Sequence, residues 1–258
     1  MARKIVLTSG KGGVGKTTIC ANLGVQLAKR GKRVVMLDAD VGLNNLDVLM
    51  GVENKVVYDI FDVLDGKCRL KQALIPDMYL PNLYILPSTH TFGNAKMGSA
   101  QFRHIVDSLG NFDYVLIDCP AGISGGFHRA VSAASEAYVV VNSAISSLRD
   151  ADKVLSLLSS YNLDRVGLII NRLRGDMVLR REMMGVEDVA RLLRKKPMAV
   201  IPESDDIALS ASCGSMCDYD GVFSLLAENV ETGSHKIYDC TQKYRGFMGR
   251  IKSYGRRI

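Results

Sequence analysis

The chain has 258 residues, of which 47% are hydrophobic and 23% are charged, the balance of an ordinary globular protein. No run of about 18 apolar residues occurs, and only a few apolar residues follow the charged start, so the sequence indicates neither a membrane-spanning helix nor a secretory signal peptide. The formal net charge is +6, and residues 243–258 carry all of this excess, with six cations and no acid. The length and the absence of a linker therefore predict one neutral domain over residues 1–242 and a basic tail over residues 243–258.

Short apolar runs alternate with helical patterns along the whole domain. The strand candidates are residues 4–8, 34–38, 83–86, 114–118, 138–142, 166–171 and 198–201. Most are uninterrupted apolar runs, as expected where helices cover both faces of a sheet. We therefore predict a three-layer α/β/α fold with a mostly parallel sheet, in which ligands bind at the carboxyl ends of the strands.

A glycine-rich stretch directly follows the first strand candidate. Residues 10–18 read GKGGVGKTT and lead into an amphipathic helix predicted over residues 16–30. The spacing of one glycine, four residues and then Gly-Lys-Thr is the phosphate-loop pattern. Because the full pattern stands between a strand and a helix, it predicts a P-loop NTPase.

Each residue type in this loop suits a bound phosphate. Glycines let the backbone curl with its N–H groups pointing inward. We expect Lys16 to reach the β- and γ-phosphates and the Thr17 hydroxyl to bind Mg²⁺, while the helix N-terminus presents its positive end to the anion. The predicted contacts in the loop itself are Gly12, Gly13, Val14, Gly15, Lys16, Thr17 and Thr18.

Acidic residues follow two other strand candidates. Asp38 and Asp40 stand one residue apart after an apolar strand, so that one carboxylate can face Mg²⁺ and the other the attacking water. An alternative is an acid-rich turn that caps the next helix. Asp118 ends another apolar run, which is the Walker B arrangement for holding a magnesium-bound water.

The second half of the chain offers fewer signals. A helix is predicted over residues 148–158, opened by serines that suit an N-cap. Asn171 ends a strand candidate and has donors and acceptors for an adenine edge, although asparagine is also common in turns. The six cysteines follow no zinc-ligand spacing and are expected to be reduced, as in a cytoplasmic protein.

Several of these segments together resemble one family of ATPases. Lys11 directly follows the first glycine of the loop, DADVGLNNLD begins at the end of the second strand candidate, and Asp118 begins the run Asp-Cys-Pro-Ala-Gly. This set resembles the deviant Walker A, or MinD/ParA, family of P-loop ATPases. The resemblance implies ATP and Mg²⁺ as ligands, a homodimer formed with ATP, and a Lys11 that crosses the dimer interface to the partner's nucleotide.

The resemblance also assigns roles to residues outside the loop. It implies that Asp40 orients the hydrolytic water, with Lys11 and Lys16 as the other catalytic residues, and that Asn45 lies at the dimer surface. The adenine contacts that it implies are Asn171, Arg172, Pro202 and Glu203. The metal site expected from sequence and resemblance together comprises Thr17, Asp38, Asp40 and Asp118.

Within the family, the chain resembles the cell-division branch over almost its whole length. This implies an ATPase that lies peripherally on the inner face of the cell membrane and helps to place the division septum. It would recruit a MinC-like division inhibitor and be released on hydrolysis, stimulated by a MinE- or DivIVA-linked activator. The alternatives are a MinD-like flagellar-placement ATPase and a ParA-type DNA-partition ATPase, although we do not expect DNA as a partner.

The tail has the pattern of an amphipathic helix at a membrane surface. Its apolar residues fall on an arc of about 120°, with Arg245, Lys252 and Arg256 on the other side and with Arg250 and Arg257 flanking the apolar stripe. The predicted membrane contacts are Phe247, Met248, Arg250, Ile251, Lys252, Tyr254 and Ile258. A terminal helix docked on the domain and a basic nucleic-acid arm remain alternatives.

Overall fold

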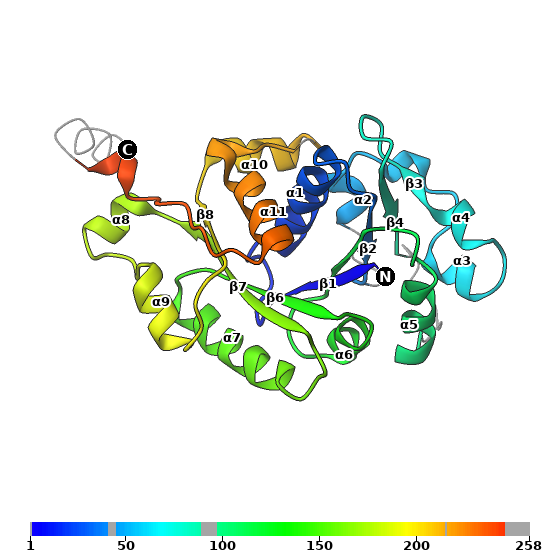
Figure 1. Ribbon diagram of the computed structural model, residues 1–258, viewed down its shortest axis with the longest axis horizontal. Helices are drawn as coiled ribbons and strands as arrows, with labels where there is room; N and C mark the ends of the chain where they lie inside the picture. The colour runs from blue at the N-terminus through cyan, green and yellow to red at the C-terminus, as the bar shows by residue number, and fades with distance from the viewer. Residues whose placement is uncertain (1, 41–44, 89–96, 215, 246–258) are drawn as a thin grey trace.

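The computed structural model describes residues 2–40, 45–88, 97–214 and 216–245, and Figure 1 shows how their helices and strands are arranged. One eight-stranded sheet runs through the molecule in the order β3-β4-β2-β5-β1-β6-β7-β8. All of its neighbouring strands pair in parallel except β3, which lies antiparallel to β4 at one edge. The predicted three-layer fold with a mostly parallel sheet is confirmed.

The strands are β1 Arg3–Thr8, β2 Val34–Asp38, β3 Ile75–Pro76, β4 Leu83–Leu86, β5 Tyr114–Asp118, β6 Glu136–Val141, β7 Arg165–Leu173 and β8 Ala199–Pro202. The α-helices are α1 Lys16–Lys29, α2 Leu46–Leu49, α3 Ile60–Leu64, α4 Leu70–Ala73, α5 Ser99–Asp107, α6 Gly125–Ser132, α7 Ile145–Leu158, α8 Gly175–Leu179, α9 Val186–Leu192, α10 Asp205–Ser212 and α11 Val222–Thr232. Short 3₁₀ helices lie at η1 Glu53–Lys55, η2 Tyr219–Gly221 and η3 Gln242–Tyr244.

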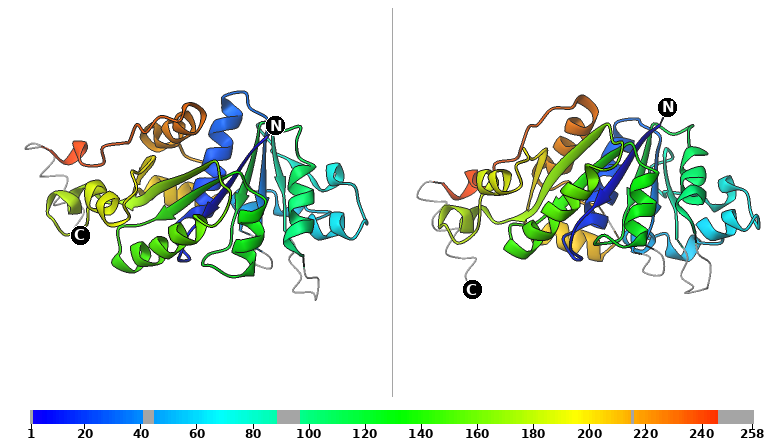
Figure 2. Two further views of the ribbon diagram at one scale, coloured as in Figure 1. Left: turned by 60° about the horizontal axis from the view of Figure 1, so that its bottom comes forward. Right: turned by 90° about the horizontal axis from the view of Figure 1, so that it is seen from below.

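Two hydrophobic cores hold the helices to the two faces of the sheet. One contains Phe102 of α5, Phe127 of α6 and Leu148 of α7, and the other contains Leu23 of α1 and Phe223 of α11. Figure 2 shows α1 and α11, in blue and orange, on the side of the sheet opposite the green helices α5, α6 and α7. Burial on both faces explains why the central strands are continuous apolar runs.

The strand register brings the predicted site residues together at the carboxyl ends of the central strands. Asp38 of β2 pairs with Asp118 of β5, and Asp118 pairs in turn with Leu7 of β1. All three strands end there, and the chain of β1 continues into the glycine-rich loop. The parallel alignment therefore places that loop, Asp38 and Asp118 beside one another.

Several details of the sequence analysis differ from the structure. The strands predicted over residues 138–142, 166–171 and 198–201 are Glu136–Val141, Arg165–Leu173 and Ala199–Pro202. Helix α7 begins at Ile145 with Ala144 as its N-cap and without a side-chain cap, so the prediction that serines cap it was wrong. Ser147 lies in the first turn, where its hydroxyl accepts a hydrogen bond from the backbone N–H of Asn142 at 3.3 Å. Strand β3 was not predicted, because two residues carry no detectable periodicity.

The start of the predicted tail packs on the domain. Tyr244 in η3 is buried, and the Lys243 ammonium donates a hydrogen bond to the Tyr219 hydroxyl at 2.6 Å. The predicted membrane contacts, from Phe247 onward, lie outside the described residues. Among the helices that the structure does describe, none is long and apolar enough to span a membrane.

Candidate functional site

The glycine-rich loop wraps the N-terminus of α1. Gly13 and Gly15 have φ angles of 75° and 93°, which side chains other than glycine adopt at a cost. Gly15 is the N-cap of α1 and offers no side chain to its first N–H groups, which leaves them for an anion. At Gly10, a Cβ atom would lie only 2.5 Å from the backbone carbon of Asp150, so α7 packs directly against the start of the loop.

Asp118 lies at the floor of the site. Its Oδ2 accepts a hydrogen bond from the Thr17 hydroxyl at 2.6 Å, whereas its buried Oδ1 has no hydrogen-bond partner among the described residues. Burial raises the pKa of Asp118 to about 6, although Lys16 and the Thr17 hydroxyl act in the opposite direction. A carboxylate oxygen that is buried without a partner, next to a hydroxyl, suits a cation such as Mg²⁺.

Asp38 caps the next helix, α2, as the alternative interpretation of this acid-rich turn predicted. Its Oδ2 accepts hydrogen bonds from the backbone N–H groups of Asn45 and Leu46 at 3.1 and 3.3 Å, and its Oδ1 accepts one from Asp40 at 2.9 Å. Burial and the nearby charge of Asp118 raise the pKa of Asp38 to about 7. A role for Asp38 beside the metal stays a prediction.

Asp40 is half-buried, two residues after Asp38. Burial raises the pKa of Asp40, and the charges of Lys16 and Arg129 partly offset that effect. Arg129 of α6 was not singled out from the sequence. Its guanidinium donates to the carbonyl oxygens of Met97 and Ala39 at 3.4 and 3.5 Å, which brings it near Asp40 from a different helix. No local motif marks such a residue, because only the fold brings α6 to this edge.

A cavity of about 570 Å³ joins these groups. It is lined by Gly12, Gly13, Gly15, Lys16, Thr17, Thr18, Asp38, Asp40, Asn45, Val48, Leu49, Asp118, Cys119, Ala121, Arg172 and Ala211. Within the described parts of the chain, no three His, Cys, Asp or Glu side chains are arranged to hold a metal ion by themselves. A magnesium ion here would therefore share its coordination among Thr17, Asp118 and phosphate oxygens, as is usual for Mg²⁺.

A second cavity of about 420 Å³ adjoins the first. Asn171, Arg172, Pro202 and Glu203, the four predicted adenine contacts, line it together with residues of α10. The amide of Asn171 is already engaged, because its Nδ2 donates a hydrogen bond to the carbonyl of Val14 at 2.8 Å. Asn171 therefore also braces the phosphate loop, a contact that its position in the sequence did not indicate.

Lys11 points away from both cavities. It is exposed, and its ammonium donates a hydrogen bond to the Ser146 hydroxyl in the first turn of α7 at 3.3 Å. It does not line the cavity that Lys16 and Thr17 share. Of the two loop lysines, Lys16 thus serves the site of its own chain and Lys11 faces outward.

Comparison with known proteins agrees with this geometry. Residues 5–215 match the CobQ/CobB/MinD/ParA nucleotide binding domain. A putative septum site-determining protein MinD of Guillardia theta is 48% identical over 83% of this chain and 80% of its own length.

Two solved structures have the same fold. MinD in a MinC:MinD cell division protein complex from Aquifex aeolicus has a TM-score of 0.85 and 39% identity, over 92% of this chain and 98% of its own. MinD from Pyrococcus horikoshii, complexed with Mg-ADP, has a TM-score of 0.81 and 32% identity, over 90% and 97% of the two chains. The chain therefore belongs to the MinD family of septum site-determining proteins, within the MinD/ParA group of P-loop ATPases.

Proposed function

We propose that this chain is a magnesium-dependent ATPase that dimerises with ATP, binds a membrane in that state and helps to place the division septum. The observation that carries the proposal is the joined cavity at the carboxyl ends of β1, β2 and β5. There Lys16, Thr17 and Asp118 meet around space for a phosphate chain. Membership of the septum site-determining family gives that site its cellular role.

The two adjoining cavities divide the nucleotide between them. The phosphates would lie on the loop, held by backbone N–H groups and by Lys16, with the base in the cavity lined by Asn171 and Pro202. The relative from Pyrococcus horikoshii was crystallised with Mg-ADP. When bound, magnesium would neutralise charge on the phosphates, and Thr17 and Asp118 are the groups placed to hold it.

Hydrolysis would depend on Asp40. Asp40 lines the phosphate cavity, where its carboxylate can accept a hydrogen bond from a water and orient that water. Burial raises its pKa, which makes the carboxylate a better proton acceptor than an exposed aspartate. Lys16 and Arg129 keep it charged and in place.

Dimerisation would bring Lys11 into use. Lys11 is exposed and does not line its own cavity, which supports a contact with the nucleotide of a second copy of the chain. Two exposed isoleucines lie on neighbouring segments, Ile123 after β5 and Ile145 at the start of α7, and are 51% and 77% exposed. Burying these side chains would contribute apolar area to such an interface.

The tail would give the dimer its membrane affinity. Six cations without an acid attract an anionic surface, and the apolar stripe inserts at the interface. One short helix binds weakly, but two tails on one dimer gain about 10²- to 10⁴-fold through avidity. ATP-driven pairing would therefore switch membrane binding on, and hydrolysis would switch it off.

A MinC-like division inhibitor is the partner that the comparisons favour, since a relative was solved in a MinC:MinD complex. We further propose a MinE- or DivIVA-linked activator of hydrolysis, by the family resemblance. Neither partner requires a nucleic-acid surface.

Co-sedimentation with anionic phosphatidylserine vesicles tests the proposal. The full chain should pellet with vesicles in ATP and not in ADP, and an Asp40→Ala variant, slow to hydrolyse, should pellet at least as well as the wild type. The matched control is a chain ending at Arg245, which keeps the buried Tyr244 and removes residues 246–258, where all the predicted membrane contacts lie. Vesicle binding that ignores the nucleotide, or that survives this truncation, would contradict the proposal.

The same assay separates the DNA-partition alternative from the two membrane-binding ones. A ParA-type partition ATPase would leave the vesicles bare and bind plain duplex DNA in ATP, with affinity that falls steeply as salt rises. A flagellar-placement ATPase would also bind vesicles in ATP, and only its partner proteins would distinguish it. Pull-down with a MinC-like protein in ATP is the measurement that decides between septum placement and flagellar placement.

A further inference from the structure

Three residues other than glycine have left-handed backbone conformations in the described part of the chain: Arg172, Arg181 and Arg194, with φ angles of 56°, 61° and 49°. Two of them have an ordinary reason. Arg181 and Arg194 each stand one position after the C-cap of a helix, α8 and α9 respectively. The left-handed conformation is the usual way for a helix to end at that position.

The hydrogen bonds at these two helix ends confirm that reason. The N–H of Arg194 donates to Arg191 and that of Lys195 to Ala190, at 3.3 and 3.1 Å, so the last carbonyls of α9 are satisfied. The N–H groups of Arg181 and Glu182 satisfy the end of α8 in the same way. Strain at these positions is part of closing a helix.

Arg172 has no such reason, because it lies inside strand β7. From Ile170 to Leu173 the chain of β7 advances three residues, while its partner β8 advances only two, from Val200 to Pro202. One extra residue on one strand is a β-bulge. A bulge interrupts the alternation of side chains and re-aims one of them, and bulges are frequent beside binding sites.

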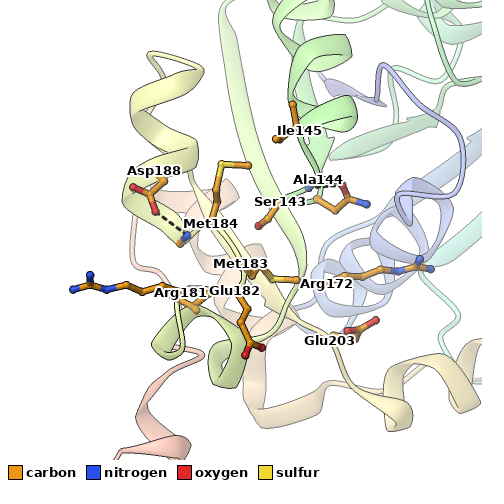
Figure 3. A pocket seen from close by; sticks show the side chains of 13 residues that line it. Ser143, Ala144, Ile145, Arg172, Arg181, Glu182, Met183, Met184, Asp188 and Glu203 are labelled. Carbon is orange, nitrogen blue, oxygen red and sulfur yellow. Dashed lines mark hydrogen bonds between the residues drawn. The ribbon is translucent and has the colours of Figure 1, made fainter. Parts of the chain in front are cut away.

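The re-aimed side chain reaches the nucleotide cavities. Arg172 lines both the phosphate cavity and the adjoining one, which also share Gly15, Thr18 and Ala211. It borders a third cavity of about 890 Å³ beside α7 and α9, but Figure 3 shows its side chain extending away from Met183 and Met184 there. Among the described residues its guanidinium forms no hydrogen bond or ion pair.

We propose that the bulge in β7 holds Arg172 in a strained conformation in order to aim its guanidinium at the sugar-phosphate junction of the bound nucleotide. The chain would thus give up some stability of the free protein for nucleotide affinity. This inference rests on the proposed nucleotide-binding function. The α-phosphate and ribose are common to ADP and ATP, so the contact serves both nucleotides alike.

Replacement of Arg172 by glycine tests both halves of the inference in one variant. Glycine adopts φ near +56° without a Cβ penalty and removes the guanidinium. We expect Arg172→Gly to raise the Tm of the nucleotide-free protein by about 2 °C and to weaken ADP binding about tenfold. Titration calorimetry with ADP and thermal unfolding without nucleotide are the two measurements.

Arg194→Gly is the matched control, because it also replaces a left-handed arginine by glycine and Arg194 lines neither nucleotide cavity. It should raise the Tm similarly and leave the Kd for ADP unchanged. Arg172→Lys keeps a cation on the strained backbone and should retain part of the affinity. ATP, measured in the slow Asp40→Ala background, should lose affinity by the same factor as ADP.

The outcomes separate this inference from the proposed function. If Arg172→Gly binds ADP as tightly as the wild type, or if its Tm falls, Arg172 is structural and the inference is overturned. If only ATP affinity falls, the guanidinium contacts the γ-phosphate and the proposed position is wrong. A wild-type chain that binds no ADP would overturn the proposed function itself, and this inference with it.

Discussion

Two buried acids, Glu136 and Asp118, lie at opposite ends of the central strands, and their pKa values are shifted in opposite directions. Glu136 begins β6, where Arg3 donates two hydrogen bonds to its carboxylate at 2.7 and 2.9 Å and the Tyr138 hydroxyl donates a third at 2.8 Å. Burial alone would raise the pKa of Glu136, but these hydrogen bonds outweigh it and lower the pKa below its usual value. Asp118, at the end of β5, keeps one buried oxygen without a partner among the described residues, and its pKa is raised to about 6.

The difference distinguishes an acid that serves the fold from one that serves a ligand. Around Glu136 every charge has a partner within the chain, so the cluster ties β1, β6 and α11 together, the last through the Val230 carbonyl that also accepts from Arg3. Around Asp118 and Asp38 the chain leaves two acids close together and incompletely compensated. Such an arrangement costs stability unless a cation joins it.

The largest effect is expected from Lys16, the cation that faces these acids. Lys16→Ala should reduce ATP turnover at least ~100-fold, because a preorganised charge on the phosphates is lost. Lys29→Ala, at the other end of the same helix, is the control and should leave turnover unchanged. Steady-state phosphate release measures both variants. Comparable turnover in the two would show that the acid-rich end of the sheet is not the catalytic end.

A second prediction concerns the close packing of α7 against the start of the phosphate loop. Gly10→Ala should lower the free energy of unfolding by about 2–3 kcal/mol, because its Cβ would meet the backbone of Asp150 at 2.5 Å. Gly12→Ala is the matched control, since the nearest atom to its Cβ would be Ala121 at 3.9 Å, an ordinary contact. Urea denaturation checks the difference, and equal midpoints for the two variants would contradict it.

The pH dependence of ADP binding sharpens the comparison further. Above pH 6 Asp118 is charged and can hold magnesium, whereas below its raised pKa a proton competes with the metal. The factor by which Mg²⁺ strengthens ADP binding should therefore fall about tenfold for each pH unit below 6.

The nucleotide's own phosphates titrate near pH 6, so this experiment needs a control. Asp118→Asn isolates that contribution, because the amide does not ionise. Calorimetric titrations of both proteins between pH 5 and pH 8 should show that the gain in ADP affinity from Mg²⁺ falls more steeply with decreasing pH in the wild type. Parallel curves would mean that Asp118 does not bind the metal.

The smallest predicted effect belongs to the paired acid. Glu136→Gln should cost about 1 kcal/mol of unfolding free energy at pH 7, by weakening the hydrogen bonds from Arg3. A lowered pKa means that this stability is complete above the unfolded value near 4.5 and is lost as pH falls through the folded pKa. The stabilities of the wild type and the variant should therefore converge once the pH falls below the lowered pKa of Glu136, with ADP affinity at pH 7 unaltered. A stability difference that stays constant down to the acid limit of the folded state would point to packing instead of charge.

Sequence patterns were sufficient for the fold and for the bounds of three strands, although β6, predicted at residues 138–142, runs over Glu136–Val141. The ranges of β2, β4 and β5 match the predicted ones residue for residue, because a strand buried on both faces must be apolar throughout. The phosphate loop was equally readable, since its chemistry is confined to consecutive residues. These features are local, and local features leave a signal in the sequence.

What the sequence did not reveal depends on contacts across the fold. Arg129 approaches Asp40 from α6, and Asn171 braces Val14 from 157 residues away. The bulge at Arg172 arises from a mismatch between two strands, which neither strand shows alone. Such features require knowledge of which elements are neighbours.

Calorimetric titration of ADP at pH 8, with and without Mg²⁺, tests the central claim most directly. It should be made on the wild type, Asp118→Asn and Glu136→Gln. If the incompletely compensated acid exists for the metal, Mg²⁺ will strengthen ADP binding to the wild type and to Glu136→Gln and will have little effect on Asp118→Asn. An equal gain from Mg²⁺ in all three proteins would contradict the account.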